Sequence, residues 1–149
     1  SATTCTSCPQ PLLLLYTNCY DKCPTGFYPS PNTNICLMCE GLVTNCAECV
    51  SGGCLKCKDN FYLSKANNAT SYSCVSSCPA GYYADTSNKI CLKCTAANCL
   101  ECTSPTQCTK CAATYYSFNG ACLLSCPTGY APVNTAGVLS CAPCKQGCK

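Results

Sequence analysis

The stretch CLKCTAANCLECTSPTQCTKC (residues 91–111) and its continuation AATYYSFNGACLLSCPTGY (residues 112–130) decide the fold. Three closely spaced Cys-x2-Cys pairs come first, and a ten-residue interval then separates Cys111 from Cys122. The interval contains Asn119-Gly120, which strongly favours a two-residue β-hairpin turn because both residues tolerate positive φ. We therefore expect dense cysteine clusters to alternate with short hairpins.

The same spacing recurs along the chain. The motif Cys-x3-Cys-Pro-x-Gly-aromatic begins at Cys19, Cys74 and Cys122, with periods of 55 and 48 residues. Internal repetition of this kind is typical of tandem modules that contact only their neighbours. We expect the tail of a preceding repeat at 1–18, complete repeats at 19–73 and 74–121, and an incomplete repeat at 122–149. Because both ends fall inside a repeat, we interpret the chain as a piece of a longer array or a subunit whose ends join a neighbour.

The composition indicates a fold that is held together by disulfide bonds. Cysteine supplies 23 of the 149 residues, about 15%, which exceeds the roughly 8–10% that marks a disulfide scaffold. Leu, Ile, Val and Phe together also supply only about 15%, too little for an ordinary apolar core. The net charge of +3 is far from that of a disordered chain. Disulfides at this density persist outside the cytosol, so we expect an extracellular or cell-surface location.

Several function classes are disfavoured. The chain has no His, Arg or Trp, so it lacks the commonest general base, and we expect neither an enzyme nor a cofactor. The nine lysines are scattered singly and form no basic stripe for nucleic acid. No apolar run approaches the roughly 20 residues of a membrane span. The six carboxylates stand alone, without a calcium-loop pattern, and are expected to be solvated.

The cysteine spacing from Cys91 to the Cys126-Pro-x-Gly-Tyr motif resembles furin-like, growth-factor-receptor-type cysteine-rich repeats, and the resemblance covers essentially the whole chain. The absence of Arg, with abundant Asn, Lys, Thr and Ser, is most like the long arrays in protist (ciliate-type) surface proteins. The resemblance implies a small disulfide-rich fold. In it, tandem modules of short β-hairpins form an elongated rod with no substantial helix.

The resemblance also implies a disulfide pattern. One bridge would close the base of each hairpin: Cys8 to Cys19, Cys23 to Cys36, Cys57 to Cys74, Cys78 to Cys91, Cys111 to Cys122 and Cys126 to Cys141. Two interleaved bridges would hold each dense cluster: Cys39 to Cys49 with Cys46 to Cys54, and Cys94 to Cys102 with Cys99 to Cys108. Spacing alone leaves a rival pairing open, in which Cys19 joins Cys36, Cys23 joins Cys39 and the pattern continues similarly.

Three cysteines are left over in that pattern: Cys5, Cys144 and Cys148. By position in the repeat, Cys148 matches Cys99 and Cys5 matches Cys108, which the resemblance pairs with each other. We hypothesise that Cys148 bonds to the counterpart of Cys5 in the following unit. That unit would belong either to the same longer chain or to the next subunit of a fibre.

Three further features have competing interpretations. The Cys-x2-Cys pairs invite a zinc site, but zinc ribbons separate their pairs by roughly 15–20 residues, whereas four residues separate Cys49 from Cys54. Paired aromatics such as Phe27/Tyr28 are interpreted as packing on disulfides rather than as ligand platforms. The run Leu12–Leu15 is either a lateral contact surface or local packing.

Asn68-Ala69-Thr70 is an N-glycosylation acceptor, and we expect Asn68 to carry a glycan.

These observations favour a non-enzymatic extracellular structural protein, a glycosylated rod that builds a surface coat, stalk or filament by tandem or end-to-end stacking. Its partners would be glycans and either copies of itself or adjoining repeats of a longer chain. The alternative is a receptor or ligand ectodomain module that binds a protein partner. A zinc-binding, cysteine-rich protein is the weakest of the three hypotheses.

Overall fold

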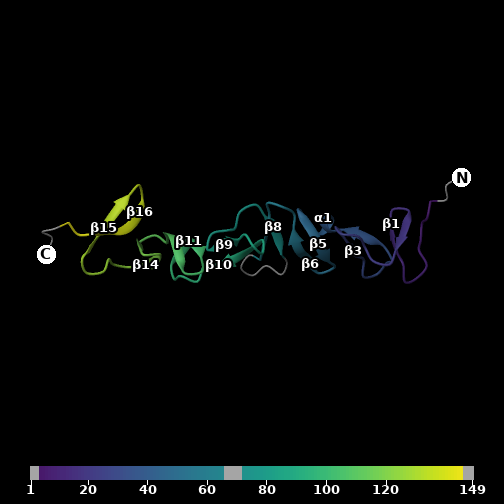
Figure 1. Cartoon of the computed structure of the whole chain (residues 1–149), viewed down its shortest axis with the longest axis horizontal. Coiled ribbons are helices and arrows are strands. Elements are labelled where there is room, and N and C mark those ends of the chain that lie inside the picture. The colour runs from purple at the N-terminus through teal and green to yellow at the C-terminus, as the bar shows by residue number, and fades with distance from the viewer. Residues whose placement is uncertain (1–3, 66–71, 146–149) are drawn as a thin grey trace. The chain divides into compact units, whose positions relative to one another are not determined.

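The computed structural model describes residues 4–65 and 72–145, so Asn68 and Cys148 lie outside the described residues (Figure 1). The described chain is small and strand-rich, with one helical turn, which confirms the predicted fold of short β-hairpins with no substantial helix. The chain divides into two compact units. Unit 1 comprises residues 1–77 and 87–90, and unit 2 comprises residues 78–86 and 91–149. No helix in the described ranges is long and apolar enough to span a membrane.

Short strands make up both units. The elements of unit 1 are β1 (Leu13–Leu15), β2 (Asn18–Tyr20), β3 (Phe27–Pro29), β4 (Cys36–Met38), α1 (Cys39–Leu42), β5 (Cys46–Val50), β6 (Gly53–Cys57), β7 (Tyr62–Ser64) and β8 (Ser73–Val75). Those of unit 2 are β9 (Tyr82–Asp85), β11 (Cys99–Ser104), β12 (Gln107–Cys111), β13 (Tyr116–Phe118), β14 (Ala121–Leu123), β15 (Tyr130–Thr135) and β16 (Val138–Pro143). Strand β10 (Ile90–Lys93) begins with the last residue of unit 1 and continues in unit 2.

Successive strands form the expected antiparallel hairpins. In the hairpin of β13 and β14, Phe118 pairs with Ala121, so Asn119 and Gly120 alone form the turn. Their φ angles are 48° and 80°, as the Asn-Gly signal predicts. The sequence therefore specifies this turn locally.

Parallel bridges join consecutive hairpins, and the sequence pattern gives no sign of them. Leu14 bridges Ile35, Leu63 bridges Ile90, and Ser117 bridges Ser140. The second residue of each bridge directly precedes a cysteine that closes the later hairpin. In unit 2 the bridge completes a four-stranded sheet in the order β14-β13-β16-β15.

The core consists mainly of cysteine. Among the described residues, eight of the nine buried apolar side chains are cysteines and the ninth is Leu15. Tyr28 and Phe61 pack against a cluster of buried cysteines around Cys39 and Cys46, as the aromatic pairs predict. Leu12, Leu13 and Leu14 are each half-buried, which favours local packing of this run over a lateral contact surface.

The helical turn α1 distinguishes the first complete repeat from the second. Six residues separate Cys39 from Cys46, whereas four separate Cys94 from Cys99. The longer interval has room for one turn, closed by a 2.9 Å hydrogen bond from the Val43 N–H to the Cys39 carbonyl. In the shorter interval the N–H groups of Thr95 and Ala96 both donate to the Pro105 carbonyl.

Candidate functional site

Ten disulfides join cysteines of the described residues. Six close hairpins: Cys8 to Cys19, Cys23 to Cys36, Cys57 to Cys74, Cys78 to Cys91, Cys111 to Cys122, and Cys126 to Cys141. Four form two interleaved pairs: Cys39 to Cys49 with Cys46 to Cys54, and Cys94 to Cys102 with Cys99 to Cys108. These are the ten pairs that the family resemblance implies. We call each interleaved set a knot and its cysteines A, B, C and D in chain order, so that A bonds to C and B bonds to D.

Backbone geometry fixes where each knot begins. The N–H of the A cysteine donates to a glycine carbonyl, from Cys39 to Gly26 and from Cys94 to Gly81, at 2.8 Å in both cases. These glycines have φ angles of 89° and 81°. Such positive values favour glycine over other residues, which explains why the Cys-Pro-x-Gly-aromatic motif needs glycine at this position.

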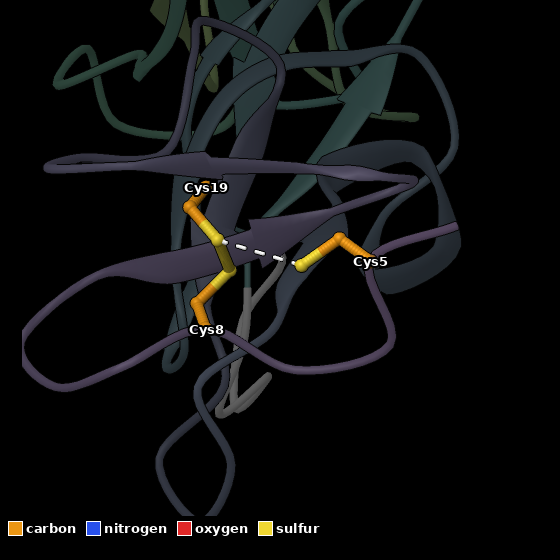
Figure 2. Close-up of side chains that lie close together, drawn as sticks. All are labelled: Cys5, Cys8 and Cys19. Atoms are coloured by element: carbon orange, nitrogen blue, oxygen red, sulfur yellow. Dashed lines mark hydrogen bonds between the residues drawn. A yellow bond between two sulfur atoms is a disulfide. The ribbon is translucent and has the colours of Figure 1, made fainter. Parts of the chain in front are cut away.

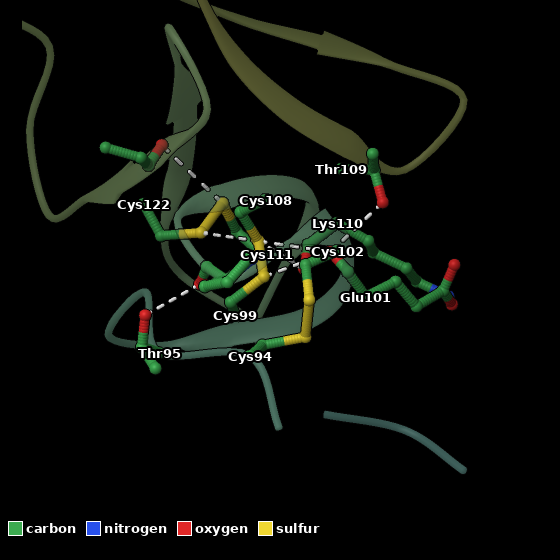
Figure 3. Close-up of a disulfide and its surroundings, with 12 residues drawn as sticks. Cys94, Thr95, Cys99, Glu101, Cys102, Cys108, Thr109, Lys110, Cys111 and Cys122 are labelled. Atoms are coloured by element: carbon green, nitrogen blue, oxygen red, sulfur yellow. Dashed lines mark hydrogen bonds and ion pairs between the residues drawn. A yellow bond between two sulfur atoms is a disulfide. The ribbon is translucent and has the colours of Figure 1, made fainter. Parts of the chain in front are cut away.

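The D cysteine ends each knot, and its sulfur packs on the next hairpin disulfide. The Sγ atom of Cys54 lies 3.6 Å from that of Cys74. The Sγ atom of Cys108 lies 3.4 Å from that of Cys122. Figure 3 draws these two side chains side by side. All four sulfurs are in disulfides and carry no proton, so these are packing contacts rather than hydrogen bonds. Each knot is thus stacked on the hairpin that follows it.

A carbonyl contact also recurs at the D position. The Cys54 sulfur lies 3.3 Å from the Lys56 carbonyl oxygen, two residues further along the chain. The Cys108 sulfur lies 3.1 Å from the Lys110 carbonyl oxygen at the same offset. The B cysteines make the same carbonyl contact, Cys46 to Glu48 at 3.2 Å and Cys99 to Glu101 at 3.0 Å, so the sulfur neighbour is what distinguishes the D position.

Cys5 has both contacts of a D cysteine but no disulfide partner. Its thiol donates to the Ser7 carbonyl, two residues along, at 2.9 Å. Its Sγ atom lies 3.8 Å from the Sγ of Cys19 in the first hairpin disulfide (Figure 2). Cys5 is a free, half-buried cysteine, whereas Cys54 and Cys108 are buried. Cys5 therefore lies in the D position without a B partner.

Cys144 has the backbone geometry of an A cysteine. Its N–H donates to the carbonyl of Gly129 at 2.9 Å, and Gly129 has a φ of 88°. Cys144 is also a free, half-buried cysteine. The described residues thus contain the start of one knot at Cys144 and the end of another at Cys5, and the leftover Cys148 lies outside them.

The sulfur clusters bear on the zinc hypothesis. In the part of the chain that the structure describes, three groups of three sulfurs lie within 4.8 Å of one another: Cys5 with Cys8 and Cys19, Cys54 with Cys57 and Cys74, and Cys99 with Cys108 and Cys122. Zinc binds thiolates, and a sulfur in a disulfide is not one. Within these three groups, Cys5 alone is unbonded, so the oxidised chain offers zinc a single thiolate there.

Three of the carboxylates are exposed, as expected, but they do not stand alone, because each has a lysine partner. Glu48 pairs with Lys56 at 3.2 Å, and Glu101 pairs with Lys110 at 3.0 Å, at corresponding places on the two knot hairpins. Glu40 on α1 accepts a hydrogen bond from Lys58 at 2.6 Å. The pKa of Glu40 is lowered, mainly by this hydrogen bond and secondly by the positive charge of Lys58. Cross-strand pairing, which the sequence pattern does not reveal, brings Glu48 to Lys56 and Glu101 to Lys110. Glu40 on α1 instead meets Lys58, which directly follows β6.

Comparison with known proteins identifies the repeat. A family model of the furin-like repeat, cysteine-rich, matches residues 67–141. The chain is 31% identical over 135 residues to furin-like protease 2 of Drosophila melanogaster, covering 88% of this chain and 7% of that protein. It is 32% identical over 117 residues to human R-spondin-2, covering 75% of this chain and 44% of that protein.

A third relative bears on location. The human extracellular matrix organizing protein FRAS1 is 31% identical over 112 residues, covering 74% of this chain and 3% of that protein. The chain therefore spans less than half the length of each of these relatives. Together with ten disulfides, which persist in oxidising compartments, the FRAS1 match points to an extracellular location. By the repeat, its bridges and the matching family model, the chain belongs to the family of furin-like cysteine-rich repeats.

Proposed function

We propose that this chain is a non-enzymatic structural module of the cell surface or extracellular space, a disulfide-stapled rod that builds a coat, stalk or filament by tandem or end-to-end stacking. The observation that carries the proposal is the recurrence of the parallel bridge between consecutive hairpins, at Leu14/Ile35, Leu63/Ile90 and Ser117/Ser140. Modules that pair only with their neighbours in sequence can be extended by adding further modules.

The arrangement of polar groups supports a non-catalytic role. The chain has no histidine, and Glu40, Glu48 and Glu101 each face a lysine ammonium group at the surface. The hydrogen bond from Lys58 lowers the pKa of Glu40, which makes that carboxylate a weaker general base. Among the described cysteines, only Cys5 and Cys144 are free thiols, so only these two could act as nucleophiles.

A glycan at Asn68 is part of the proposal. Asn68-Ala69-Thr70 lies between Cys57 and Cys74, the longest interval without cysteine. The test compares the secreted chain with its Asn68→Gln variant by intact mass before and after treatment with peptide N-glycosidase. We expect an enzyme-sensitive sugar mass on the natural sequence only. An identical mass for both proteins contradicts the glycan without affecting the fold.

Electron microscopy and sedimentation of the secreted chain test the structural role. We expect extended particles whose length grows in steps with protein concentration, because end-to-end stacking is a mass-action process. The control is the same chain after complete reduction and alkylation, which removes the staples and abolishes the particles. Monomers that stay compact at all concentrations contradict the proposal. Stoichiometric bound zinc with many free thiols overturns both the proposed compartment and the function.

A partner-binding module is the second candidate, and one observation favours it. A surface hollow of about 290 Å³ lies beside the Glu40 and Lys58 ion pair, and Phe27 and Met38 contribute to its lining. Met38 is 53% exposed. Methionine is enriched in protein interfaces, whose rims are polar. Saturable binding of the monomer to cells, lost in a Met38→Asp variant and retained in Leu55→Asp, favours this candidate over stacking.

A further inference from the structure

We propose that the surface hollow of about 290 Å³ in the first complete repeat binds an extended peptide segment of another protein. The main chain of this segment pairs with Gly26 and Ala47, and an apolar side chain of the segment packs on Met38. The inference rests on the partner-binding candidate described above, and it names the chemistry of the partner. End-to-end stacking does not depend on it.

The second complete repeat shows how the residues that correspond to Gly26 and Ala47 interact. There the Gly81 N–H donates to the Leu100 carbonyl at 2.6 Å. Gly26 and Gly81 are the glycines of the Cys-Pro-x-Gly-aromatic motif, and Ala47 and Leu100 each directly follow a B cysteine. The strand register passes over Ala47 and Leu100, so each is a bulge residue without a cross-strand partner. In the second repeat the glycine N–H therefore pairs with the carbonyl of the bulge residue.

In the first repeat the direct bond is missing, and a hollow lies beside both groups. The backbone hydrogen bonds among the described residues include none from the Gly26 N–H, and Gly26 and Ala47 both line the hollow. The interval between the A and B cysteines is two residues longer in this repeat, and it forms α1. The longer interval therefore separates a main-chain donor from a main-chain acceptor that bond directly in the second repeat.

An extended peptide residue has the complementary pair of groups. Its N–H and its C=O project to the same side of a strand, so one residue can accept a hydrogen bond from Gly26 and donate one to Ala47. Peptide segments are commonly bound in this way, with main-chain hydrogen bonds for affinity and hollows that select the side chains. A volume of about 290 Å³ is at the small end of ligand sites, which suits one or two residues of a segment.

The lining of the hollow favours an apolar side chain without charge. Phe27 and Met38 are cross-strand partners in β3 and β4 and both line the hollow, and Met38 is 53% exposed. Tyr16 contacts Phe27 edge to face, with 6.3 Å between the ring centroids, and is 74% exposed, so the apolar surface continues beyond the hollow. Glu40 and Lys58 also line the hollow. Because they form an ion pair at 2.6 Å, neither requires a charge on the ligand.

The test is an NMR titration of the ¹⁵N-labelled chain with the capped peptide acetyl-Gly-Ser-Leu-Ser-Gly-amide. We expect saturable shifts of the amide signals of the lining residues, with a downfield shift of the Gly26 proton as its N–H begins to donate. Glycine in place of the leucine should weaken binding about tenfold. An ester in place of the leucine amide should weaken it about fivefold, because the N–H donor is lost. Equal affinities of the amide and the ester contradict main-chain pairing.

A deletion variant makes the first repeat resemble the second. Removing Gly41 and Leu42 shortens the interval between Cys39 and Cys46 to four residues, the length that the second repeat has. We expect the Gly26 N–H to donate within the chain before any peptide is added, and peptide binding to be lost. Unchanged signals from unit 2 check that the variant folds. Peptide binding that persists in this variant overturns the proposal.

A point variant tests the apolar contact with less change to the backbone. Met38→Lys introduces the residue that the second repeat has at this place, Lys93, and it should weaken peptide binding about tenfold. Leu55→Lys is the matched control, because Leu55 is 60% exposed and is not among the residues that line the hollow. It should bind the peptide as the natural chain does. Equal losses in the two variants contradict the assignment of the side-chain contact to the hollow.

Other occupants of the hollow would give different results. If the lining signals shift when the chain is concentrated without peptide, a second copy fills the hollow and the proposal is wrong. A lack of shifts at millimolar peptide also overturns it. Cell binding that is still lost in Met38→Asp would then leave the partner-binding candidate standing with a partner of different chemistry. Particles that grow with protein concentration support stacking whatever the peptide does.

Discussion

The Sγ atom of Cys5 lies 3.8 Å from the Sγ atom of Cys19 in a neighbouring disulfide. The same relationship joins Cys54 to Cys74 at 3.6 Å and Cys108 to Cys122 at 3.4 Å. Because the last two D cysteines are bonded and the first is not, the chain contains an internal comparison between a D cysteine with a bridge and one without.

That comparison predicts unequal effects on stability. Replacing Cys5 by Ser removes no bridge, so the free energy of unfolding of the monomer should change by no more than about 0.5 kcal/mol. Removing the counterpart bridge with Cys46→Ser/Cys54→Ser should cost about 3 kcal/mol by the loop-entropy model, and more because both sulfurs are buried. Urea unfolding followed by circular dichroism measures both values. A large loss in Cys5→Ser would mean that its thiol already stabilises the chain.

The residues specify the hairpins and their turns more completely than they specify the sheets. Asn119-Gly120 determines its turn locally, because two adjacent residues that accept positive φ are enough. The parallel bridges are different, since Leu63 and Ile90 are far apart in sequence and each lies in or beside a three- or four-residue strand. Strands this short show too little periodicity to reveal a partner. Such pairing depends on tertiary packing.

The candidate site could likewise be predicted only in part. Subtracting the ten expected pairs from the 23 cysteines leaves Cys5, Cys144 and Cys148 without a partner. It gives no information about the Ser7 carbonyl contact or the hydrogen bond from Cys144 to Gly129, which depend on the three-dimensional turns. The lysine partners of Glu48 and Glu101 were missed for a related reason. Cross-strand neighbours are known only once the register is known.

A turn shared by the two repeats predicts a stabilising substitution. Asn60 and Thr114 each lie three residues after a knot hairpin, with φ angles of 66° and 75°. A β-branched residue is strained at positive φ, whereas Asn tolerates it. Thr114 is exposed, so its replacement removes little packing. Thr114→Asn should raise the free energy of unfolding of the chain by about 1 kcal/mol, measured by urea unfolding.

The reciprocal change provides the control. Asn60→Thr should lower the free energy of unfolding by a similar amount, because it places the strained residue in the other copy of the turn. Thr106→Asn, at an exposed position without positive φ, should have an effect within about 0.5 kcal/mol. Equal effects at Thr114 and Thr106 would show that backbone strain is not the cause.

The hydrogen bond from Lys58 to Glu40 predicts a pH dependence. It lowers the pKa of Glu40 in the folded chain, so its contribution to stability is complete above the unfolded-state pKa and is lost as the pH falls through the folded-state pKa. Lys58→Met should return the pKa of Glu40 towards its ordinary value, as a carboxyl carbon NMR titration would measure. The difference in stability between the two proteins should disappear in acid.

Lys56→Met is the matched control for that titration. Lys56 pairs with Glu48 rather than with Glu40, at 3.2 Å, so its loss should leave the pKa of Glu40 near that of the natural chain. Equal pKa values of Glu40 in Lys58→Met and in the natural chain would contradict the assignment. Because both side chains of the Glu40 pair are nearly half exposed, added salt should weaken the effect.

A digest without reduction distinguishes the ten bridges from the rival pairing. Lys22, Lys56, Lys93 and Lys110 are exposed, so trypsin can release the peptides 1–22, 23–56 and 94–110. In the structure, every bridge of these three peptides lies within one peptide, so each monomer peptide should separate without reduction. Its mass should be lower than that of the reduced peptide by two hydrogen atoms per bridge.

The rival pairing predicts a different set of masses from the same digest. A bond from Cys19 to Cys36 would tether 1–22 to 23–56, and the corresponding bond from Cys78 to Cys94 would tether 94–110 to the peptide that carries Cys78. Reduced and alkylated protein, digested in parallel, controls for incomplete cleavage, because an uncut peptide keeps its mass excess after reduction. Since the A, B, C and D positions are defined by this pairing, tethered peptides in the monomer would remove the basis for placing Cys5 at a D position.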